Sequence, residues 1–535
     1  MEKTKLIKVL TFCLISLLSL AISLPGSFSS GPIWPDGQRY TFNGILLHDM
    51  VRDKAIFHPY DYNVRFYAKY PATSLPYGSP FFALVFAAAF SLFGISFSVA
   101  RWVVAIYTMG AALMLWHLIY HINRSYWHAV LAVSAFLFNP LTGIYSRDIT
   151  PELALAFYSF LTIFFFYNYV EYEKKYFGIY AALAFSLGYL TKPYIIPLGM
   201  ALVLYAIIRR KLYIMYKRES LLALVITAGL IVPSTMLAFK YATNELGGTT
   251  IPSIDVNLLL AYPTIAIKCL PILTAGAIIG FIIGLLRKDN LTLLCLLWTF
   301  SCYFFFTFYL PEHQDQKYFF TFLPALIVPF VMTIDRLYFL LKKFRLNIVL
   351  IMLLIVFFAH GTLSSGVSYI RGYEEAGKYV AEHPHGKSVL FYGRYDGTFM
   401  MGIRRVIPKG GPYVLRGDRQ LAVRVSYGKA KQSVSVESSD DIIKLLNRYR
   451  TGYVAIEIES TLERDFPEYN ILMQTISSNT ELFTEVAKFP IQTNWNTLVS
   501  NELVIYKFSF DKSTNPAKKL KIPVPTLKKE LEVVF

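Results

Sequence analysis

The amino-acid sequence predicts a mainly α-helical polytopic membrane protein with an α/β domain after its last membrane span. Of its 535 residues, 55 % are hydrophobic and only 16 % are charged, and the mean hydropathy is +0.44. Soluble proteins carry about 25 % charged residues. The apolar residues also gather in runs of roughly 16–22 residues, the length that crosses about 30 Å of hydrocarbon. These observations exclude disorder, collagen, a coiled coil and an ordinary cytosolic enzyme.

The formal charge of +17 comes from 52 Lys and Arg residues against 35 Asp and Glu residues. In a soluble chain this excess would indicate a nucleic-acid partner. Here many of the cations lie in short loops between apolar runs, where they orient the spans, so no nucleic acid is expected. The four cysteines lie in or beside apolar segments and have no metal-like spacing, which favours neither a disulfide framework nor a zinc site.

The first apolar run, residues 9–24, follows Lys3, Lys5 and Lys8. It has two interpretations, a cleaved signal peptide or a retained membrane anchor. The anchor is favoured because many further spans follow. The basic residues before it then place the N-terminus in the cytoplasm.

Later apolar runs alternate with loops that differ in charge. Every second loop is basic, as in the stretch 209–218, which we assign to the cytoplasmic side. The run 80–95 is short, and a full crossing there would move that basic stretch outside. We therefore expect it to lie along the outer face or dip into it, which leaves about eleven crossings. After 9–24, the predicted spans are 102–120, 127–145, 153–170, 177–191, 195–208, 221–239, 269–286, 291–310, 318–334 and 348–363.

This topology divides the chain into a membrane module, residues 1–365, and an extracytoplasmic α/β domain, residues 366–535. The first external loop, 25–79, is long, and loops of that length are often functional. Within it, the helical spacing of its apolar residues predicts an amphipathic helix over 39–53 that rests on the membrane surface.

The domain 366–535 shows both strand and helix patterns. Apolar, β-branched stretches predict strands at 389–393, 453–459 and 503–508, and Ser and Asp residues are suited to cap a helix in 438–450. The basic tail 514–535 is rich in Pro and Lys and is expected to be extended. It either touches anionic lipid or stays solvated, and the second interpretation is favoured.

Unusual polar residues collect on the predicted external side. Each has an ordinary structural explanation: a turn or cap for Asp36, an interfacial ion pair within 147–152, a lysine that snorkels at 192, and a solvated charge cluster in 312–317. Charge at a span end is costly, however, so several charges on one face indicate a polar site. The candidates are Asp36, Arg39, Lys69, Tyr70, Arg147, Asp148, Glu152, Lys192 and His313.

Both signs of charge are present in this set. Cations such as Lys69 and Lys192 suit a phosphate, and carboxylates such as Asp36 and Glu152 suit a hydroxyl or a sugar. The combination fits a lipid phosphate sugar whose chain stays in the bilayer while its headgroup reacts outside. The sequence contains no Walker loop, HExxH, GxSxG or dinucleotide fingerprint to support a soluble nucleotide or hydrolytic mechanism.

Across roughly the first 330 residues, the sequence resembles the GT-C membrane glycosyltransferases, especially glycosyltransferase family 39. Its relatives include the protein O-mannosyltransferases and the aminoarabinose transferases that act on lipid A. The resemblance rests on the order and spacing of six motifs: PDGQRY, AKYP, FGISFSVAR, SRDITPE, LTKP and KYFFTFLPAL.

The resemblance implies transfer of a sugar from a polyprenyl phosphate to a hydroxyl, usually with inversion. By motif, Asp36 would be the general base, Arg39 would orient the acceptor or bind the donor, Lys69 would contact the phosphate, and Glu152 would position a sugar. Lys192 matches the lysine of LTKP, and we infer a phosphate role for it from its charge.

Burial is expected to raise the pKa of Asp36 toward the working pH. Relatives often have a second acidic residue after the Asp, where this chain has Gly37. That difference weakens a two-carboxylate metal site, and a divalent cation on Asp36 stays open.

Two other functions compete with the transferase. A transporter or channel would need a conduction path, broken helices near mid-membrane and repeat symmetry, and the sequence shows no convincing repeat. A receptor or scaffold would use the bundle only to anchor the C-terminal domain. The donor sugar, the polyprenol and the acceptor stay open, and the acceptor hydroxyl can belong to a protein, a glycolipid or a cell-envelope polysaccharide.

Overall fold

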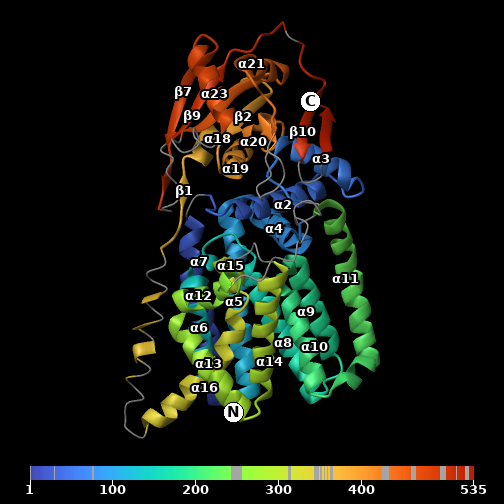
Figure 1. Ribbon diagram of the computed structural model, residues 1–535, viewed down its shortest axis with the longest axis vertical. Coiled ribbons are helices and arrows are strands. Elements are labelled where there is room, and N and C mark those ends of the chain that lie inside the picture. Colours follow the sequence, from blue (N-terminus) through green and yellow to red (C-terminus); the bar gives the residue numbers. More distant parts are fainter. Residues whose placement is uncertain are drawn as a thin grey trace.

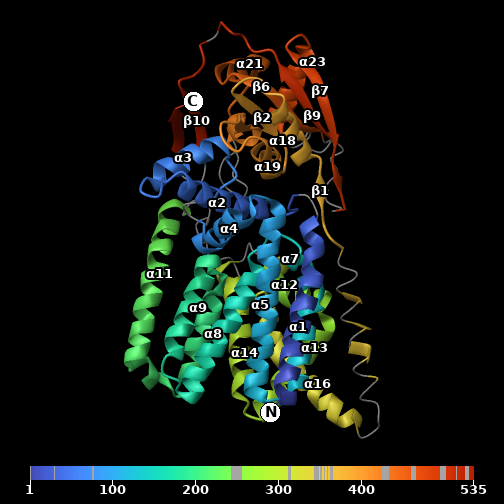
Figure 2. The same ribbon diagram turned by 180° about the vertical axis from the view of Figure 1, so that it is seen from behind.

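The protein is a bundle of helices with an α/β domain at one end, and the N-terminus lies at the opposite end (Figures 1 and 2). The arrangement is that of a multi-pass membrane protein. The computed structural model describes residues 2–28, 31–74, 78–242, 256–310, 315–342, 349, 352–354, 356–357, 360–361, 366–423, 433–458, 466–494, 502–513, 515–524 and 529–534.

Within those residues, six helices are long and apolar enough to cross a membrane, or up to eight spans if each of two bent pairs counts as one. The helices α9 and α10 are shorter, and the predicted run 348–363 lies largely outside the described residues. The predicted number of about eleven crossings therefore stays a prediction. The bundle helices are α1 (Glu2–Ser23), α5 (Phe97–Asn123), α6 (Tyr126–Leu137), α7 (Pro140–Ser146), α8 (Glu152–Tyr172), α9 (Phe177–Thr191), α10 (Ile196–Ile208), α11 (Arg218–Ala242), α12 (Val256–Cys269), α13 (Pro271–Leu286), α14 (Asn290–Phe304) and α16 (Leu323–Lys342).

The predicted span 269–286 is one half of a bent pair of helices. The run 269–286 becomes α13, and α12 before it meets α13 at an angle of 113°. Pro271 is at the start of α13 and causes the break, because a proline disfavours the helical conformation in the residue before it. The sequence prediction missed α12, whose apolar residues are interrupted by polar ones.

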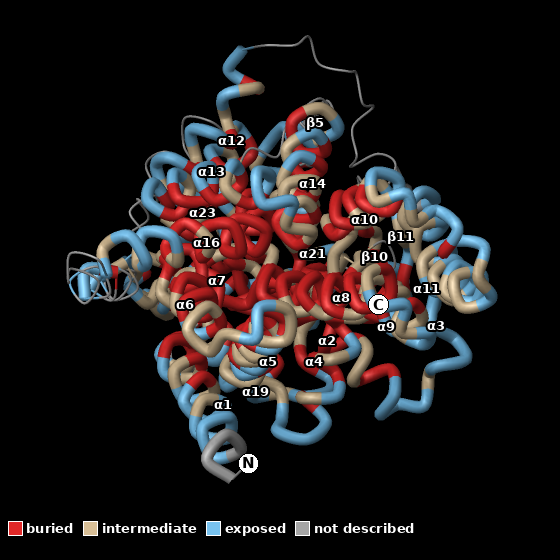
Figure 3. The backbone as a smooth tube through the Cα atoms, turned by 90° about the horizontal axis from the view of Figure 1, so that it is seen from below, coloured by how far each residue is buried: buried red, intermediate tan, exposed pale blue. Residues whose placement is uncertain are grey.

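Burial in the bundle is greatest at its centre. Viewed along the bundle, α5, α8 and α16 are mostly buried, whereas α11 lies at the periphery with exposed and half-buried residues (Figure 3). The helix α11 packs against α9, and the Tyr189 and Thr235 hydroxyls form a hydrogen bond of 2.7 Å between the two helices. The central helix α8 starts at Glu152 and so brings this charge to the end of the bundle that faces the α/β domain.

A layer of three helices separates the bundle from the α/β domain: α2 (Pro35–Arg52), α3 (Pro59–Lys69) and α4 (Pro80–Phe93). With 14 residues, α4 is about 21 Å long, too short to cross a bilayer unaided. The predicted amphipathic helix 39–53 is the larger part of α2. Its apolar residues Phe42, Ile45 and Leu46 are fully buried inside the protein, so the prediction that this helix rests on the membrane surface is wrong.

The α/β domain is built on a five-stranded sheet with the order β3-β2-β6-β9-β7. The pairs β2–β3 and β2–β6 are parallel, and β6–β9 and β9–β7 are antiparallel. The three predicted strands and the predicted helix 438–450 are confirmed as β2, β6, β9 and α21. The elements are α18 (Tyr373–Glu382), β2 (Ser388–Tyr392), α19 (Asp396–Val406), β3 (Tyr413–Arg416), α20 (Gly417–Gln420), α21 (Ser439–Arg448), β6 (Thr451–Ile458), α23 (Pro467–Ser478), β7 (Phe483–Pro490) and β9 (Glu502–Phe508).

Alternate residues of the strands face opposite layers of helices, as the pleat of a strand requires. Val389 and Phe391 of β2 belong to the core shared with α18, α19 and the bundle. Leu390 and Tyr392 belong to a second core with α21 and α23. The face that carries α18 and α19 is therefore turned toward the layer of α2.

The C-terminal tail differs from its prediction. Strands β10 (Lys519–Val524) and β11 (Lys529–Val534) pair as an antiparallel hairpin. Leu520, Ile522 and Val533 are buried in the second core of the domain. The tail is extended as expected, but it is packed rather than solvated because its apolar residues alternate with the lysines.

Candidate functional site

Asp36 lies in the first turn of α2, directly after Pro35. Proline suits the first position of a helix, and the free N–H groups there favour a negative charge. The Oδ2 atom of Asp36 is 3.4 Å from Nζ of Lys317, and its Oδ1 atom is 3.8 Å from Nη1 of Arg39. The Asp36 side chain keeps 42 % of its surface exposed, so the carboxylate is held by cations and is still open to a ligand.

Glu152 and Lys192 form the second ion pair of the site. Glu152 starts α8, and Lys192 directly follows α9, where the chain turns into the short helix η2 (Pro193–Ile195). Nζ of Lys192 is 2.6 Å from Oε1 of Glu152, and the Glu152 side chain is only 3 % exposed. The pair thus joins the ends of two helices at the level where α2 begins.

The two ion pairs belong to one group. We call Asp36, Arg39, Glu152, Lys192 and Lys317 the charge cluster. Lys192 is close enough to Asp36 to lower its pKa, and the charges of both Asp36 and Glu152 act on Tyr40. The structure thus places Asp36, Glu152 and Lys192 at the same end of the bundle.

The pKa of Asp36 is lowered, whereas the sequence predicted that it would be raised. Burial by itself raises this pKa, but the positive charges of Lys317, Arg39 and Lys192 outweigh burial and hold it below the usual value of an aspartate. Asp36 is therefore ionised at neutral pH. The prediction considered burial alone and missed that three cations face this carboxylate.

Aromatic rings surround the two lysines. The Lys192 ammonium lies 4.8 Å from the ring centre of Tyr194 and 5.6 Å from that of Tyr318, and Lys317 lies 5.1 Å from the Tyr318 ring. Such contacts stabilise an ammonium that is partly removed from water. Tyr40, Tyr194, Lys317 and Tyr318 were not among the predicted site residues, although Lys317 was considered within the charged segment 312–317. The signal was present, because these residues belong to the motifs QRY, LTKPY and KYF.

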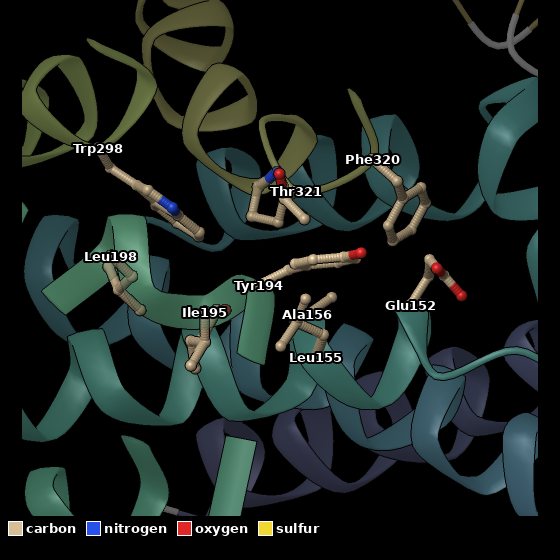
Figure 4. A pocket seen from close by; sticks show the side chains of 11 residues that line it. Glu152, Leu155, Ala156, Tyr194, Ile195, Leu198, Trp298, Phe320 and Thr321 are labelled. Carbon is tan, nitrogen blue, oxygen red and sulfur yellow. The ribbon is translucent and has the colours of Figure 1, made fainter. Parts of the chain in front are cut away.

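A narrow cavity extends from Glu152 between the bundle helices. Figure 4 shows the Glu152 carboxylate at one end, the Tyr194 hydroxyl turned toward it, and Leu198 and Trp298 at the other end. The Oε2 atom of Glu152 is buried and has no hydrogen-bond partner among the described residues. The cavity is therefore polar at the charge cluster and apolar inside the bundle.

Gly37 has no room for a side chain. A Cβ atom at this position would lie 2.8 Å from Cβ of Pro32 and 3.0 Å from the carbonyl oxygen of Ile149. The second acidic residue that often follows the Asp in relatives cannot be placed here without moving α2.

Arg147 and Asp148 lie beside the charge cluster, and their side chains form hydrogen bonds with backbone groups outside it. Nε of Arg147 donates to the carbonyl oxygen of Ile22 at 2.8 Å, and Oδ1 of Asp148 accepts from the N–H of Ile149 at 2.7 Å. Burial raises the pKa of Asp148, although Arg101 nearby opposes it.

Lys69 and Tyr70 lie beside Arg404 of the α/β domain. Burial, aided by Arg404, lowers the pKa of Lys69, and burial raises the pKa of Tyr70 to about 12. His313 lies outside the described residues.

The cluster does not fit a metal ion. In the described part of the chain, no group of three or more His, Cys, Asp or Glu side chains lies close enough to hold one. The groups around Asp36 are cations, which would repel a divalent cation at that carboxylate.

Comparisons with known proteins find a partial match in sequence and a match in fold. Residues 76–239 match the family model described as dolichyl-phosphate-mannose-protein mannosyltransferase. Among curated proteins, no sequence matches the chain significantly.

Solved structures show the fold along almost the whole chain. ArnT from Cupriavidus metallidurans bound to undecaprenyl phosphate is similar with a TM-score of 0.57 and 13 % identity, covering 95 % of this chain and 99 % of that one. The apo state of the same protein gives a TM-score of 0.59 and 13 % identity, covering 92 % and 97 %.

The resemblance predicted from the sequence motifs is thus confirmed by the mannosyltransferase family model over residues 76–239 and by the ArnT fold along the chain.

Proposed function

We propose that this protein is a glycosyltransferase that moves a sugar from a polyprenyl-phosphate donor to an acceptor hydroxyl, with inversion and with Asp36 as general base. The observation that carries the proposal is the charge cluster, in which three cations and two carboxylates meet at one end of a helical bundle. The similar ArnT structure bound to undecaprenyl phosphate supports a polyprenyl donor.

The cations suit the phosphate of such a donor. A phosphodiester carries one negative charge, and a second develops as the bond to the sugar breaks. Lys192, Lys317 and Arg39 exceed the two carboxylates by one positive charge, so the cluster favours an anion and favours it more as charge builds up.

Asp36 is the carboxylate placed to take the acceptor proton. It is ionised, and 42 % of its side chain is exposed, so a hydroxyl can reach it. A donor phosphate would offset the cations that lower its pKa, which makes the carboxylate a better base once the donor is bound. In an inverting reaction the acceptor approaches opposite the leaving phosphate. The phosphate would therefore bind nearest Lys192, the cation paired with Glu152, and the sugar would lie between the phosphate and Asp36.

Glu152 then positions a sugar. Its Oε1 atom is occupied by Lys192, and its Oε2 atom is buried without a partner among the described residues, at the end of the narrow cavity that Glu152 lines. A sugar hydroxyl donating to Oε2 would satisfy this buried oxygen.

The remaining candidates extend the site. In this proposal Lys69, Tyr70 and His313 contribute to substrate binding, and Arg147 and Asp148 support the protein beside Glu152. The N-terminus and the basic stretch 209–218 lie at the end of the bundle opposite the charge cluster (Figure 1), which supports a cytoplasmic N-terminus and an extracytoplasmic α/β domain.

A donor panel tests the proposal. The purified protein in lipid vesicles is incubated with several polyprenyl-phosphate sugars and with protein, glycolipid and polysaccharide acceptors, and free polyprenyl phosphate and glycosylated product are measured. We expect one donor to yield both products in equal amounts. Failure of every donor with every acceptor class would contradict the proposal.

A further inference from the structure

The helix α19 of the α/β domain lies along the helix that carries Asp36. The Tyr395 hydroxyl donates to the carbonyl oxygen of Ile33 at 2.8 Å, just before α2 begins. Next, the N–H of Thr398 donates to Oε1 of Gln38 at 3.1 Å. Contacts near the start of α19 thus meet the start of α2.

Further along, a buried ion pair joins the same two helices. Nη2 of Arg404 lies 2.8 Å from Oδ1 and 2.6 Å from Oδ2 of Asp49, and both side chains are 5 % exposed or less. Beyond it, Nζ of Lys409 lies 2.8 Å from Oδ1 of Asp53. The contacts occur in the same order along both segments, so α2 and α19 run side by side in parallel.

The contacts with α19 and the charge cluster use different side chains of α2. Gln38 and Asp49 face the domain, whereas Asp36 meets Lys317 of the bundle. Asp49 is thirteen residues after Asp36, about 20 Å along the helix axis. A change of tilt at the Asp49 end therefore displaces Asp36, and a misplacement of about 1 Å can cost on the order of 100-fold in rate.

We propose that α19 is a clamp that fixes α2 in the position where Asp36 faces Lys317, and that Arg404 is its central positioning residue. The α/β domain then contributes to catalysis by holding the helix that carries Asp36. Its effect on catalysis rests on the proposed function, whereas the clamp itself is a property of the fold.

The buried ion pair makes Arg404 the contact of the clamp that is most costly to lose. Removal of Arg404 takes two charge-assisted hydrogen bonds from the buried Asp49, which keeps His48 and Arg52 as ion-pair partners among the described residues. The carboxylate is then less well compensated, and α2 can relieve this by moving toward water. Arg405, the next residue, offers a matched control. Its side chain is 58 % exposed and pairs with Glu374 inside the domain, so it belongs to the same helix without touching α2.

The test compares Arg404→Ala, Arg405→Ala and the exchanged pair Asp49→Arg with Arg404→Asp in the full-length protein. Hydrogen exchange of residues 33–52 reports on α2, and exchange of β2 and β6 reports on the fold of the domain. We expect Arg404→Ala to speed exchange in 33–52 at least tenfold, with β2 and β6 unchanged, and Arg405→Ala to change neither. The exchanged pair should recover part of the protection.

The kinetic readout separates positioning from binding. Arg404→Ala should lower kcat about 10- to 100-fold and leave the KM for the donor within about threefold, because Lys192 and Lys317, two of the three cations of the charge cluster, lie outside α2. Equal kcat and equal exchange in the Arg404 and Arg405 variants would overturn the clamp, as would loss of protection throughout β2 and β6. If the wild-type protein transfers no sugar, the proposed function fails, and the exchange experiment still decides the clamp.

Discussion

Lys192 and Glu152 form an ion pair of 2.6 Å that joins the end of α9 to the start of α8 in the interior of the protein. The Glu152 side chain is 3 % exposed and that of Lys192 13 %. A buried pair of this kind is costly to break on one side only, because the remaining charge keeps its desolvation cost without a partner. The pair therefore has a structural and a chemical role that mutations can separate.

Substitution Lys192→Met should lower stability by about 3–5 kcal/mol, because it leaves the Glu152 carboxylate buried and unpaired. The double variant Lys192→Met with Glu152→Gln removes both charges and should recover most of the lost stability. Neither variant should recover transfer, since both lack the phosphate cation. Thermal unfolding and sugar transfer, measured side by side, check this. Full activity in the double variant would contradict a phosphate role for Lys192.

Lys317→Gln should move the pH profile of kcat/KM. Cations outweigh burial and hold the pKa of Asp36 below 3.8, so the ionised base should persist below that pH, and activity should fall only as the pH drops through the lowered pKa. Loss of Lys317 removes one of these cations, so the acidic limb should shift to higher pH. An acidic limb that is unchanged in this variant would mean that Asp36 is not the titrating base.

Removal of divalent cations should leave transfer unchanged. Arg39, Lys192 and Lys317 already surround Asp36 with positive charge, and Gly37 leaves no space for a second carboxylate beside it. The measurement is the transfer rate after dialysis against EDTA, with and without added Mg²⁺ or Mn²⁺. A rate that falls at least tenfold and returns with the metal would contradict this electrostatic description of the site.

The sequence predicted those features that depend on local pattern. The strands β2, β6 and β9 follow from alternation of apolar residues, and α21 from its Ser438 cap. The same alternation in Leu520 and Ile522 would have revealed the C-terminal hairpin, but the proline and lysine content of the tail suggested a solvated segment.

Other features depend on contacts that pattern does not reveal. Asp36, Glu152 and Lys192 could be identified because charges at span ends are costly, whereas the approach of Lys317 to Asp36 joins residues 281 positions apart. The apolar face of α2 is the same whether it meets lipid or protein, so its burial against α4 and the rest of the protein could not be predicted. The lowered pKa of Asp36 follows from those same long-range contacts.

The most direct measurement is the transfer rate of Asp36→Asn at equal membrane levels, with Asp61→Asn as the control. Asp61 is an exposed carboxylate in the first turn of α3, so its loss removes the same charge from the same layer of helices. Loss of a general base at position 36 should lower kcat at least 100-fold, and the control should stay within about twofold of the wild type. Transfer by Asp36→Asn at a rate near that of Asp61→Asn would contradict the assignment of Asp36 as the base.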